Sequence, residues 1–347
     1  MLTCIETSSG PWAGRFARVI VGDCTQGRMP VRWGLSVPFP GVPLADHPRL
    51  YRQTEALGYD DLWSGETPNG ADGFTPLALA APVTERMRLI TGIVNPYTRG
   101  VAVLAQTAAA LQEASGGRFV LGLGASSNVT VERFNGMLFE RPLSKMREAV
   151  AALRPVLSVP PERGFGGLRL ERPVSQPVPI VLAALRGRML GLAAEVADGA
   201  FTNFLPLSGL PQVASALRQA ERARGREPHE LACRFFVLPV AEEQGMVLAR
   251  SMFSAYGSVP VYAEFFRWLG FGDAIAPMVD AYESGDRGRA AELAPEDLIR
   301  DIFVFGSPDE IHARVKEFVS GGITTVVLTP ITEPDRLPGV LEALAPA

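Results

Sequence analysis

The stretch Arg88-Leu-Ile-Thr-Gly-Ile-Val-Asn-Pro-Tyr-Thr-Arg-Gly100 has the pattern of a buried β-strand that ends in a polar turn. Its apolar residues run as far as Val94, and Asn95-Pro96 follows at once. A residue before proline is biased away from helical backbone, so we expect Asn95 to hold its amide at the end of the strand. Residues 101–115 are rich in alanine and predict a helix. A strand, a polar turn and a helix in this order predict a β/α enzyme that binds its ligand at the strand ends.

The same alternation of strands and helices continues on both sides of this stretch. Apolar runs predict further strands at 32–38, 60–64, 118–122, 179–183, 200–204, 233–240 and 324–328. Amphipathic segments predict helices at 47–57, 75–84, 142–157 and 188–196. Strands that alternate with helices form parallel sheets. About eight strands, with 303–305 as a further short one, favour a closed α/β (β/α)₈ TIM barrel over an open doubly wound sheet.

Three segments depart from this alternation. Residues 1–30 lack the apolar core of a secretory signal and predict an irregular N-terminal extension, so the barrel domain is expected over 31–347. The segment 158–177 is rich in proline and glycine and predicts a surface loop or a small hairpin. Residues 242–289 are helical and aromatic-rich, and we expect a helical insertion there, near the C-terminal third, that caps the barrel. Its aromatic residues either pack between helices or form a lid over a planar substrate.

Composition excludes several classes of function. The 347 residues are 47% hydrophobic and 20% charged with a net charge of -4, which is typical of a soluble, cytoplasmic globular enzyme. Without a long basic run or an apolar stretch of roughly 20 residues, neither nucleic acid nor a membrane is an expected partner. The three cysteines (Cys4, Cys24, Cys233) and three histidines (His47, His229, His312) are scattered. We therefore expect no metal site, no disulfide framework and no Ser-His-Asp triad.

The candidate ligand-binding residues follow the predicted strands, because parallel barrels bind ligands at the carboxyl ends of their strands. Five segments qualify: 36–40, 64–68, 92–95, 122–128 and 183–188. In the fourth, two glycines allow close approach of the backbone and Ser126, Ser127 and Asn128 add polar groups, although such a turn is equally consistent with a structural role. The fifth segment leads into a predicted helix, and the helix amino terminus with Arg186 and Arg188 nearby favours binding of a phosphate. The alternative is that both arginines are solvated charges at the start of the helix.

Acidic residues flank the second predicted strand. Glu66 follows it, and its carboxylate is either a proton donor or acceptor or an ordinary surface charge. Asp60 and Asp61, at the other end of that strand, are interpreted as loop charges.

Several of these segments together resemble the luciferase-like monooxygenase superfamily, in particular its branch that uses the deazaflavin coenzyme F420. The resemblance covers about residues 32–330. It is most specific in Thr91-Gly-Ile-Val-Asn-Pro-Tyr-Thr-Arg99, in Gly117-Arg-Phe-Val-Leu-Gly-Leu-Gly-Ala-Ser-Ser127 with Phe134-Asn-Gly and Arg141-Pro-Leu-Ser-Lys-Met-Arg147, and in Pro179-Ile-Val-Leu-Ala-Ala184 with Leu192-Ala-Ala-Glu-Val-Ala-Asp-Gly199.

The resemblance implies a TIM barrel, usually a homodimer, that holds a flavin or deazaflavin at the strand ends. It also implies a non-prolyl cis peptide between Gly92 and Ile93, behind the ring of the cofactor. The positions expected to bind the cofactor, with its phosphate near the last five, are Ser36, Gly92, Ile93, Val94, Asn95, Ser126, Ser127, Asn128, Ala183, Ala184, Leu185, Arg186 and Gly187.

Two departures from the family pattern bear on the reaction. Many relatives have Asp-His after the second strand, where this chain has Gly65-Glu66. The sugar-phosphate dehydrogenases of the group have a glutamate after the fourth strand, where Ser126 or Ser127 stands here. We therefore expect reduction of an activated C=C, C=N or C=O group rather than oxidation of a sugar phosphate. The proton would come from Glu66, a serine or water.

These observations lead to one functional hypothesis and two alternatives. The first is an oxidoreductase that transfers a hydride between F420 and a small organic substrate. The second is an FMN-dependent monooxygenase of the same fold, because flavin and deazaflavin share their ring outline. The third is a catalytically silent barrel that binds a ligand.

Overall fold

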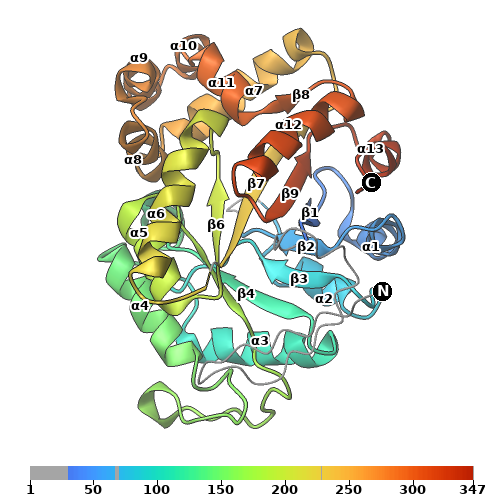
Figure 1. Ribbon diagram of the computed structural model, residues 1–347, viewed down its shortest axis with the longest axis vertical. Helices are drawn as coiled ribbons and strands as arrows, with labels where there is room; N and C mark the ends of the chain where they lie inside the picture. Colours follow the sequence, from blue (N-terminus) through green and yellow to red (C-terminus); the bar gives the residue numbers. More distant parts are fainter. Residues whose placement is uncertain (1–29, 67–69, 228, 347) are drawn as a thin grey trace.

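Eight parallel strands close into a barrel in the computed structural model, which describes residues 30–66, 70–227 and 229–346 (Figure 1). Strands β1 to β6 pair in sequence order, β6 pairs with β7, and β9 pairs with both β7 and β1. The predicted TIM barrel is confirmed. The predicted extension lies outside the described residues apart from Pro30. The strands of the ring are β1 Arg32–Val37, β2 Asp61–Ser64, β3 Arg88–Thr91, β4 Phe119–Leu123, β5 Ile180–Ala183, β6 Gly199–Asn203, β7 Glu230–Leu238 and β9 Thr325–Pro330.

Helices surround the strands on the outside of the barrel (Figure 1). They are α1 His47–Ala56, α2 Thr75–Ala80, α3 Val101–Ala114, α4 Pro142–Leu153, α5 Gly187–Val196, α6 Leu210–Arg222, α12 Pro308–Ser320 and α13 Leu337–Ala343. The sequence interpretation did not identify α6, α12 or α13. Each of the three has a proline at its first or second position, where the missing N–H costs no helical hydrogen bond.

Five helices lie between β7 and the two-residue strand β8 (Val304–Phe305), which pairs with β7. They are α7 Glu242–Gly257, α8 Pro260–Trp268, α9 Gly272–Glu283, α10 Arg287–Glu292 and α11 Glu296–Ile302. The helical insertion is therefore where it was expected, although helices continue past residue 289. Phe253, Phe265 and Phe266 are fully buried, which supports the packing interpretation for these rings. Tyr256 and Tyr262 instead contact the ring of Phe204, just beyond β6.

The inside of the barrel is filled by one side chain from each of seven strands. Trp63 is the largest and stacks on Phe201, with 4.8 Å between the ring centroids. The eighth strand contributes Gly34, where a Cβ atom would lie only 3.0 Å from the indole of Trp63. The indole thus occupies the space that a side chain on β1 would need. These inward-facing residues, the inner cluster, are Trp63, Ile90, Val120, Val181, Phe201, Ala232 and Val327.

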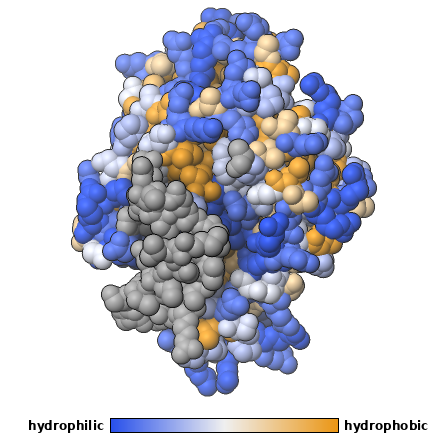
Figure 2. Space-filling model, turned by 45° about the vertical axis from the view of Figure 1, so that its right-hand side comes forward, coloured by the Kyte–Doolittle hydropathy of each residue, from blue (hydrophilic) through white to orange (hydrophobic). Residues whose placement is uncertain are grey.

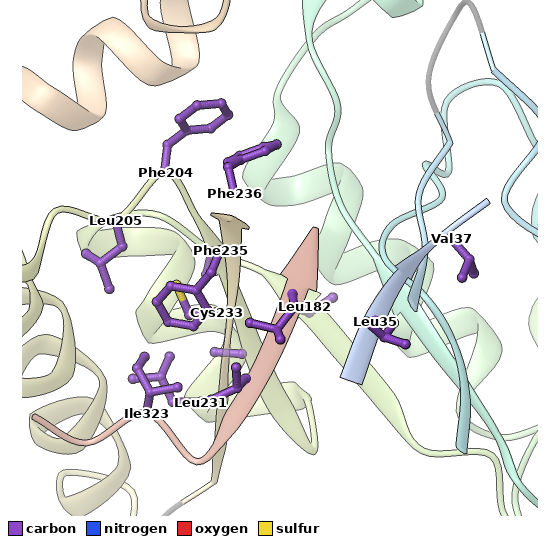
Figure 3. Packing of buried hydrophobic residues seen from close by; sticks show 14 of the residues in the cluster. Leu35, Val37, Leu182, Phe204, Leu205, Leu231, Cys233, Phe235, Phe236 and Ile323 are labelled. Carbon is purple, nitrogen blue, oxygen red and sulfur yellow. The ribbon is translucent and has the colours of Figure 1, made fainter. Parts of the chain in front are cut away.

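Alternate residues of the same strands pack outward against the helices, since successive side chains of a strand point to opposite faces. Leu35, Leu182 and Phe235 belong to this larger outer cluster (Figure 3). Figure 3 also shows Phe204 and Phe236 at one end of the strands, close to a helix of the insertion. The two clusters explain why the strands are apolar along nearly their whole length.

The surface shown in Figure 2 is mainly hydrophilic, with hydrophobic residues in separate groups. In the part of the chain that the structure describes, no helix combines the length and apolarity needed to cross a membrane.

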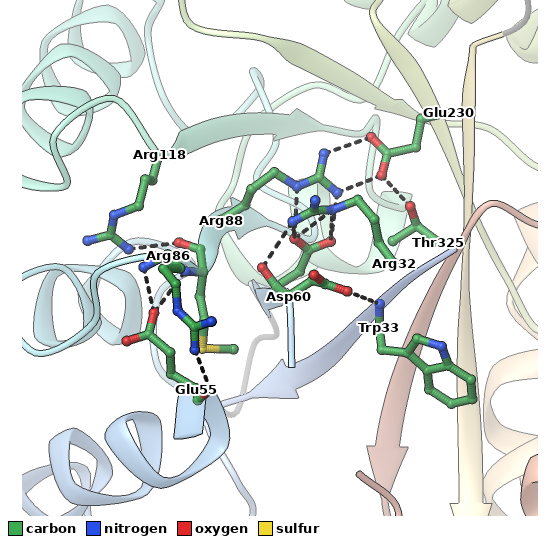
Figure 4. A network of polar contacts seen from close by, with 11 residues as sticks. Arg32, Trp33, Glu55, Asp60, Arg86, Arg88, Arg118, Glu230 and Thr325 are labelled. Atoms are coloured by element: carbon green, nitrogen blue, oxygen red, sulfur yellow. Dashed lines mark hydrogen bonds and ion pairs between the residues drawn. The ribbon is translucent and has the colours of Figure 1, made fainter. Parts of the chain in front are cut away.

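A network of charges closes the amino-terminal end of the barrel (Figure 4). Asp61, fully buried, pairs with Arg32 and Arg88, each through an Nη2–Oδ distance of 2.6 Å. Arg88 Nη2 also lies 2.7 Å from Oε1 of Glu230. Burial disfavours ionisation of Asp61, but the two arginines together outweigh burial and lower its pKa.

The interpretation of Asp61 as a loop charge was therefore wrong. Asp61 starts β2 two residues before Trp63 and so faces the interior, where the alternation also places both arginines. Asp60 does lie in a loop, where its carboxylate accepts a hydrogen bond from the backbone N–H of Trp33.

Replacing Asp61 by asparagine is expected to lower the free energy of unfolding by about 3 to 5 kcal/mol, because Arg32 and Arg88 would lose the carboxylate that they share. Urea unfolding followed by circular dichroism measures this change. Folding lowers the pKa of Asp61, so its stabilisation is present at neutral pH and is lost as the pH falls through the folded-state pKa. The wild type should consequently lose more stability in acid than Asp61→Asn does.

The matched control is Glu113→Gln, which removes a carboxylate from an exposed ion pair with Arg172 and should leave the unfolding curve unchanged. An Asp61→Asn curve that overlays the wild-type curve would show that the network does not stabilise the barrel.

Candidate functional site

The carboxyl ends of the strands form a mouth whose inner wall carries both apolar and polar side chains. Side chains alternate between the inside and the outside of the barrel along each strand. A residue two positions beyond Gly34 or beyond a member of the inner cluster therefore faces the inside as well. Ile93 and Ala183 contact the inner cluster directly. The barrel mouth is defined here by Ser36, Ile93, Gly124, Ala183, Asn203, Arg234 and Thr329.

One side of the mouth is a small apolar floor made of Ile93, Gly124 and Ala183. A Cβ atom on Gly124 would lie 2.7 Å from Cδ1 of Ile93 and 3.0 Å from Cβ of Ala183. The side chain of Ile93 therefore rests directly on the backbone of Gly124. Only glycine at position 124 leaves room for this contact.

The peptide bond between Gly92 and Ile93 is cis, as the family resemblance implied. Backbone hydrogen bonds hold the segment on both sides. The Gly92 N–H donates to Ser64 O at 2.7 Å, and Ile93 O accepts from the Glu66 N–H at 3.1 Å. β3 ends at Thr91, earlier than predicted, and Val94 resumes pairing only as an isolated bridge to Leu123.

Some of the expected cofactor contacts point away from the mouth. Val94 and Ala184 are buried in the outer cluster, and Leu185 packs against it. The side chains of Val94 and Ala184, next to the inward-facing Ile93 and Ala183, face the helices, so only their backbone atoms remain for a ligand. The sequence interpretation took whole segments and did not separate the two faces of the chain.

Asn95 is 2% exposed, and its side chain organises the turn that follows it. Its Oδ1 accepts hydrogen bonds from the backbone N–H groups of Tyr97 and Thr98, at 3.1 and 2.9 Å. The hydroxyl of Thr98 donates to the same oxygen. The expectation that the Asn95 amide is held at the strand end is met, and its Nδ2 is the part that is left for a ligand.

Ser126, Ser127 and Asn128 are partly exposed and lie between β4 and the short π-helical turn Val129–Phe134. Ser126 has a φ of 64°, which is uncommon for a residue other than glycine. The hydroxyl of Ser127 accepts from the Thr130 N–H at 3.3 Å and so caps the turn. The backbone and hydroxyl of Ser126 are the groups with no such structural duty among the described residues.

The segment from Ala183 to Gly187 ends at the amino terminus of α5. No side chain of the described residues caps that helix, and the N–H groups of Gly187 and Arg188 have no acceptor among those residues, whereas Met189 and Leu190 donate to Arg186 O. Arg186 is partly exposed, and its Nη1 lies 3.8 Å from the Glu264 carboxylate, which makes a weak surface pair. A helix amino terminus and a nearby arginine favour an anion, and the phosphate site at this segment stays a prediction.

Glu66 lies in an ion pair with Arg99, and the distance between Oε1 and Nη2 is 2.5 Å. Its second oxygen, Oε2, is buried and has no hydrogen-bond partner among the described residues. Arg99 also lies over the ring of Phe74 and 3.6 Å from Asp72. Glu66 is therefore fixed beside the backbone of Ile93, with one oxygen uncommitted.

The opposite side of the mouth carries polar residues that the sequence interpretation missed. Arg234 Nε donates to Asn203 Oδ1 at 3.1 Å, and Asn203 Nδ2 donates to Tyr262 Oη at 2.9 Å. The signal for Arg234 was a single arginine inside the apolar run Cys233-Arg-Phe-Phe-Val-Leu238. Neither Asn203 nor Tyr262 carried a comparable signal, because their contacts join β6 to the distant helix α8.

None of the three histidines is among the residues that define the barrel mouth. His47 accepts from the Phe39 N–H at 2.9 Å, and burial lowers its pKa. His229 contacts Glu221, and His312 stacks on Trp33. The described residues contain no group of three or more His, Cys, Asp or Glu side chains that would hold a metal ion.

Comparisons with solved structures find the same fold. A coenzyme F420-dependent tetrahydromethanopterin reductase from Methanopyrus kandleri is 23% identical, with a TM-score of 0.74 over 91% of this chain and 98% of that one. An oxygenating constituent of 3,6-diketocamphane monooxygenase from Pseudomonas putida, in complex with FMN, is 16% identical, with a TM-score of 0.65 over 91% and 97%.

Sequence comparisons find relatives of similar length. A protein of Mycobacterium tuberculosis, proposed to be a coenzyme F420-dependent oxidoreductase, is 27% identical over 86% of this chain and 95% of its own length. The 5,10-methylenetetrahydromethanopterin reductase of Methanolobus tindarius is 29% identical over 83% and 91%. The family profile described as luciferase-like monooxygenase matches residues 26–325. The chain belongs to the luciferase-like monooxygenase family.

Proposed function

We propose that this protein is an oxidoreductase that uses coenzyme F420 to reduce an activated C=C, C=N or C=O group of a small organic substrate. The observation that carries the proposal is the apolar floor of Ile93, Gly124 and Ala183, which faces a polar wall across the barrel mouth. The names of the curated relatives support F420 as the cofactor. A homodimer in the cytoplasm stays a prediction from the sequence.

The residues of the mouth fit a planar ring with an anionic tail. The apolar floor would hold one face of the ring, and Ser126 and Asn95 Nδ2 would supply hydrogen bonds at its edge. The N–H groups of Gly187 and Arg188 at the start of α5, with Arg186, would hold the phosphate. When bound there, a deazaflavin supplies hydride chemistry, while the protein orients the reactants and excludes water.

An FMN-dependent monooxygenase is the second candidate function. It is favoured by one observation, namely that solved structures of the same fold include a protein in complex with FMN.

The choice of cofactor is tested by adding F420 or FMN to the purified protein and following quenching of cofactor fluorescence. We expect saturable quenching of F420 and weaker binding of FMN. Tight FMN binding without F420 binding would reverse the order of the two functions. Binding of neither cofactor would favour the catalytically silent barrel.

Gly124→Ala is expected to raise the Kd for F420 about tenfold or more, because the new methyl group would displace Ile93 from the floor. The matched control is Gly191→Ala in α5, where an added Cβ atom meets nothing within 4 Å. Fluorescence titration of both variants gives the two values of Kd. Equal affinity of Gly124→Ala and the wild type would show that the cofactor does not rest on this floor.

Glu66 is proposed as the group that moves a proton. Its buried Oε2 has no partner among the described residues, and its other oxygen is held by Arg99. A carboxyl group fixed in this way is able to donate or accept a proton at the edge of the mouth. Ser126 or water are the alternative sources.

Glu66→Gln is expected to lower turnover of activated alkenes such as 2-cyclohexen-1-one by about 100-fold or more and to leave the Kd for F420 unchanged. Oxidation of reduced F420 in a stopped-flow experiment measures turnover. Asp72→Asn, which changes the more exposed carboxylate near Arg99, should retain turnover. Full activity of Glu66→Gln would assign the proton to Ser126 or water.

A further inference from the structure

Arg234 lies across the barrel mouth from the apolar floor. In the closed ring of strands, β7 is four strands from β3 in either direction, so the two are diametrically opposite. Arg234 is two residues beyond Ala232 of the inner cluster and therefore faces the interior. A ligand that lay against Ile93 would have Arg234 on its far side.

This arginine has no carboxylate partner among the described residues, and its Nη1 and Nη2 groups make no hydrogen bond with any of them. The ion pairs of the mouth and of the barrel base use other arginines, such as Arg99 and Arg88. A cation at a partly buried position of this kind is one of the ways in which proteins hold an anionic ligand.

Neighbouring side chains fix the orientation of the guanidinium group. Asn203 Oδ1 accepts from both Arg234 Nε and the Phe204 N–H, and Asn203 Nδ2 donates to Tyr262 Oη. All of these contacts agree with one orientation of the amide. The ring of Phe236 lies 4.8 Å from Cζ of Arg234. The side of the guanidinium that carries Nη1 and Nη2 is thus left for a ligand.

Two further hydroxyl groups at the mouth are available as donors. Thr329 Oγ1 is buried without a partner among the described residues, and Thr329 lies two residues beyond Val327 of the inner cluster. Tyr262 Oη accepts from Asn203, so its own proton is free to be donated. An unpaired buried hydroxyl costs free energy unless a ligand satisfies it.

We propose that Arg234, positioned by Asn203, binds a carboxylate group of the substrate. A carboxylate matches the two parallel N–H groups of a guanidinium, and a single arginine beside the aromatic rings of Phe236 and Phe204 suits a planar monoanion better than a phosphate. The inference rests on the proposed function for the reaction itself. The carboxylate site adds that the C=C, C=N or C=O bond to be reduced is conjugated with, or close to, a carboxylate group of the same substrate.

Benzoate and benzamide are suitable probes, because they share their shape and differ in charge. Isothermal titration of the full-length protein, with and without F420, is expected to give a Kd for benzoate at least tenfold below that for benzamide. In Arg234→Met the ratio of the Kd for benzamide to the Kd for benzoate should fall to about one. Arg172→Met, which removes an equal charge from an exposed site, should keep the preference.

Circular dichroism shows whether Arg234→Met folds. If it does not fold, the Arg234→Lys variant is used in its place. It keeps the charge but loses the paired N–H groups and the bond to Asn203, so the preference for benzoate should fall without disappearing. An unchanged preference in either Arg234 variant, or no preference in the wild type, would overturn the proposal. F420 binding without a benzoate preference would leave the proposed function in place. A benzoate preference without F420 binding would refute the function and retain the carboxylate site.

Discussion

A closed ring of parallel strands has a single inner face, and every second residue of each strand has to fit inside it. In this protein that face is filled in three levels. The ion pairs of Asp61 close the amino-terminal end, Trp63 and its neighbours fill the middle, and the barrel mouth lies at the carboxyl end. The inward positions of Asp61, Trp63 and Arg234 follow from the strand register, whereas Glu66, Asn95 and Ser126 lie in the turns beyond the strand ends.

Close approach of backbone and side chains makes this filling possible. At Gly34 the indole of Trp63 occupies the place of a side chain, and at Gly122 a Cβ atom would lie 1.7 Å from the Thr91 oxygen. The hydroxyl of Thr91 in turn hydrogen-bonds to Gly122 on both its N–H and its carbonyl. These contacts bring β3 and β4 together where the floor of the mouth begins.

Charge is distributed differently at the two ends of the barrel. At the base, Asp61 and Glu230 are matched by Arg32 and Arg88, so the network is internally paired. At the mouth, Arg234 has hydrogen-bond support from Asn203 but no carboxylate among the described residues. A paired network stabilises a fold, whereas an oriented unpaired cation is suited to a ligand.

The sequence by itself determined the barrel, the insertion and the segments at the mouth. Buried strands that alternate with helices form a local pattern, and the Gly92–Ile93 motif is contiguous in the chain. Only the tertiary structure decided that Asp61 is buried, that Val94 and Ala184 face outward, and that Arg234 meets Asn203, 31 residues away. The reason is physical: strand periodicity is read along the chain, but inner and outer faces, and contacts across the ring, depend on register and closure.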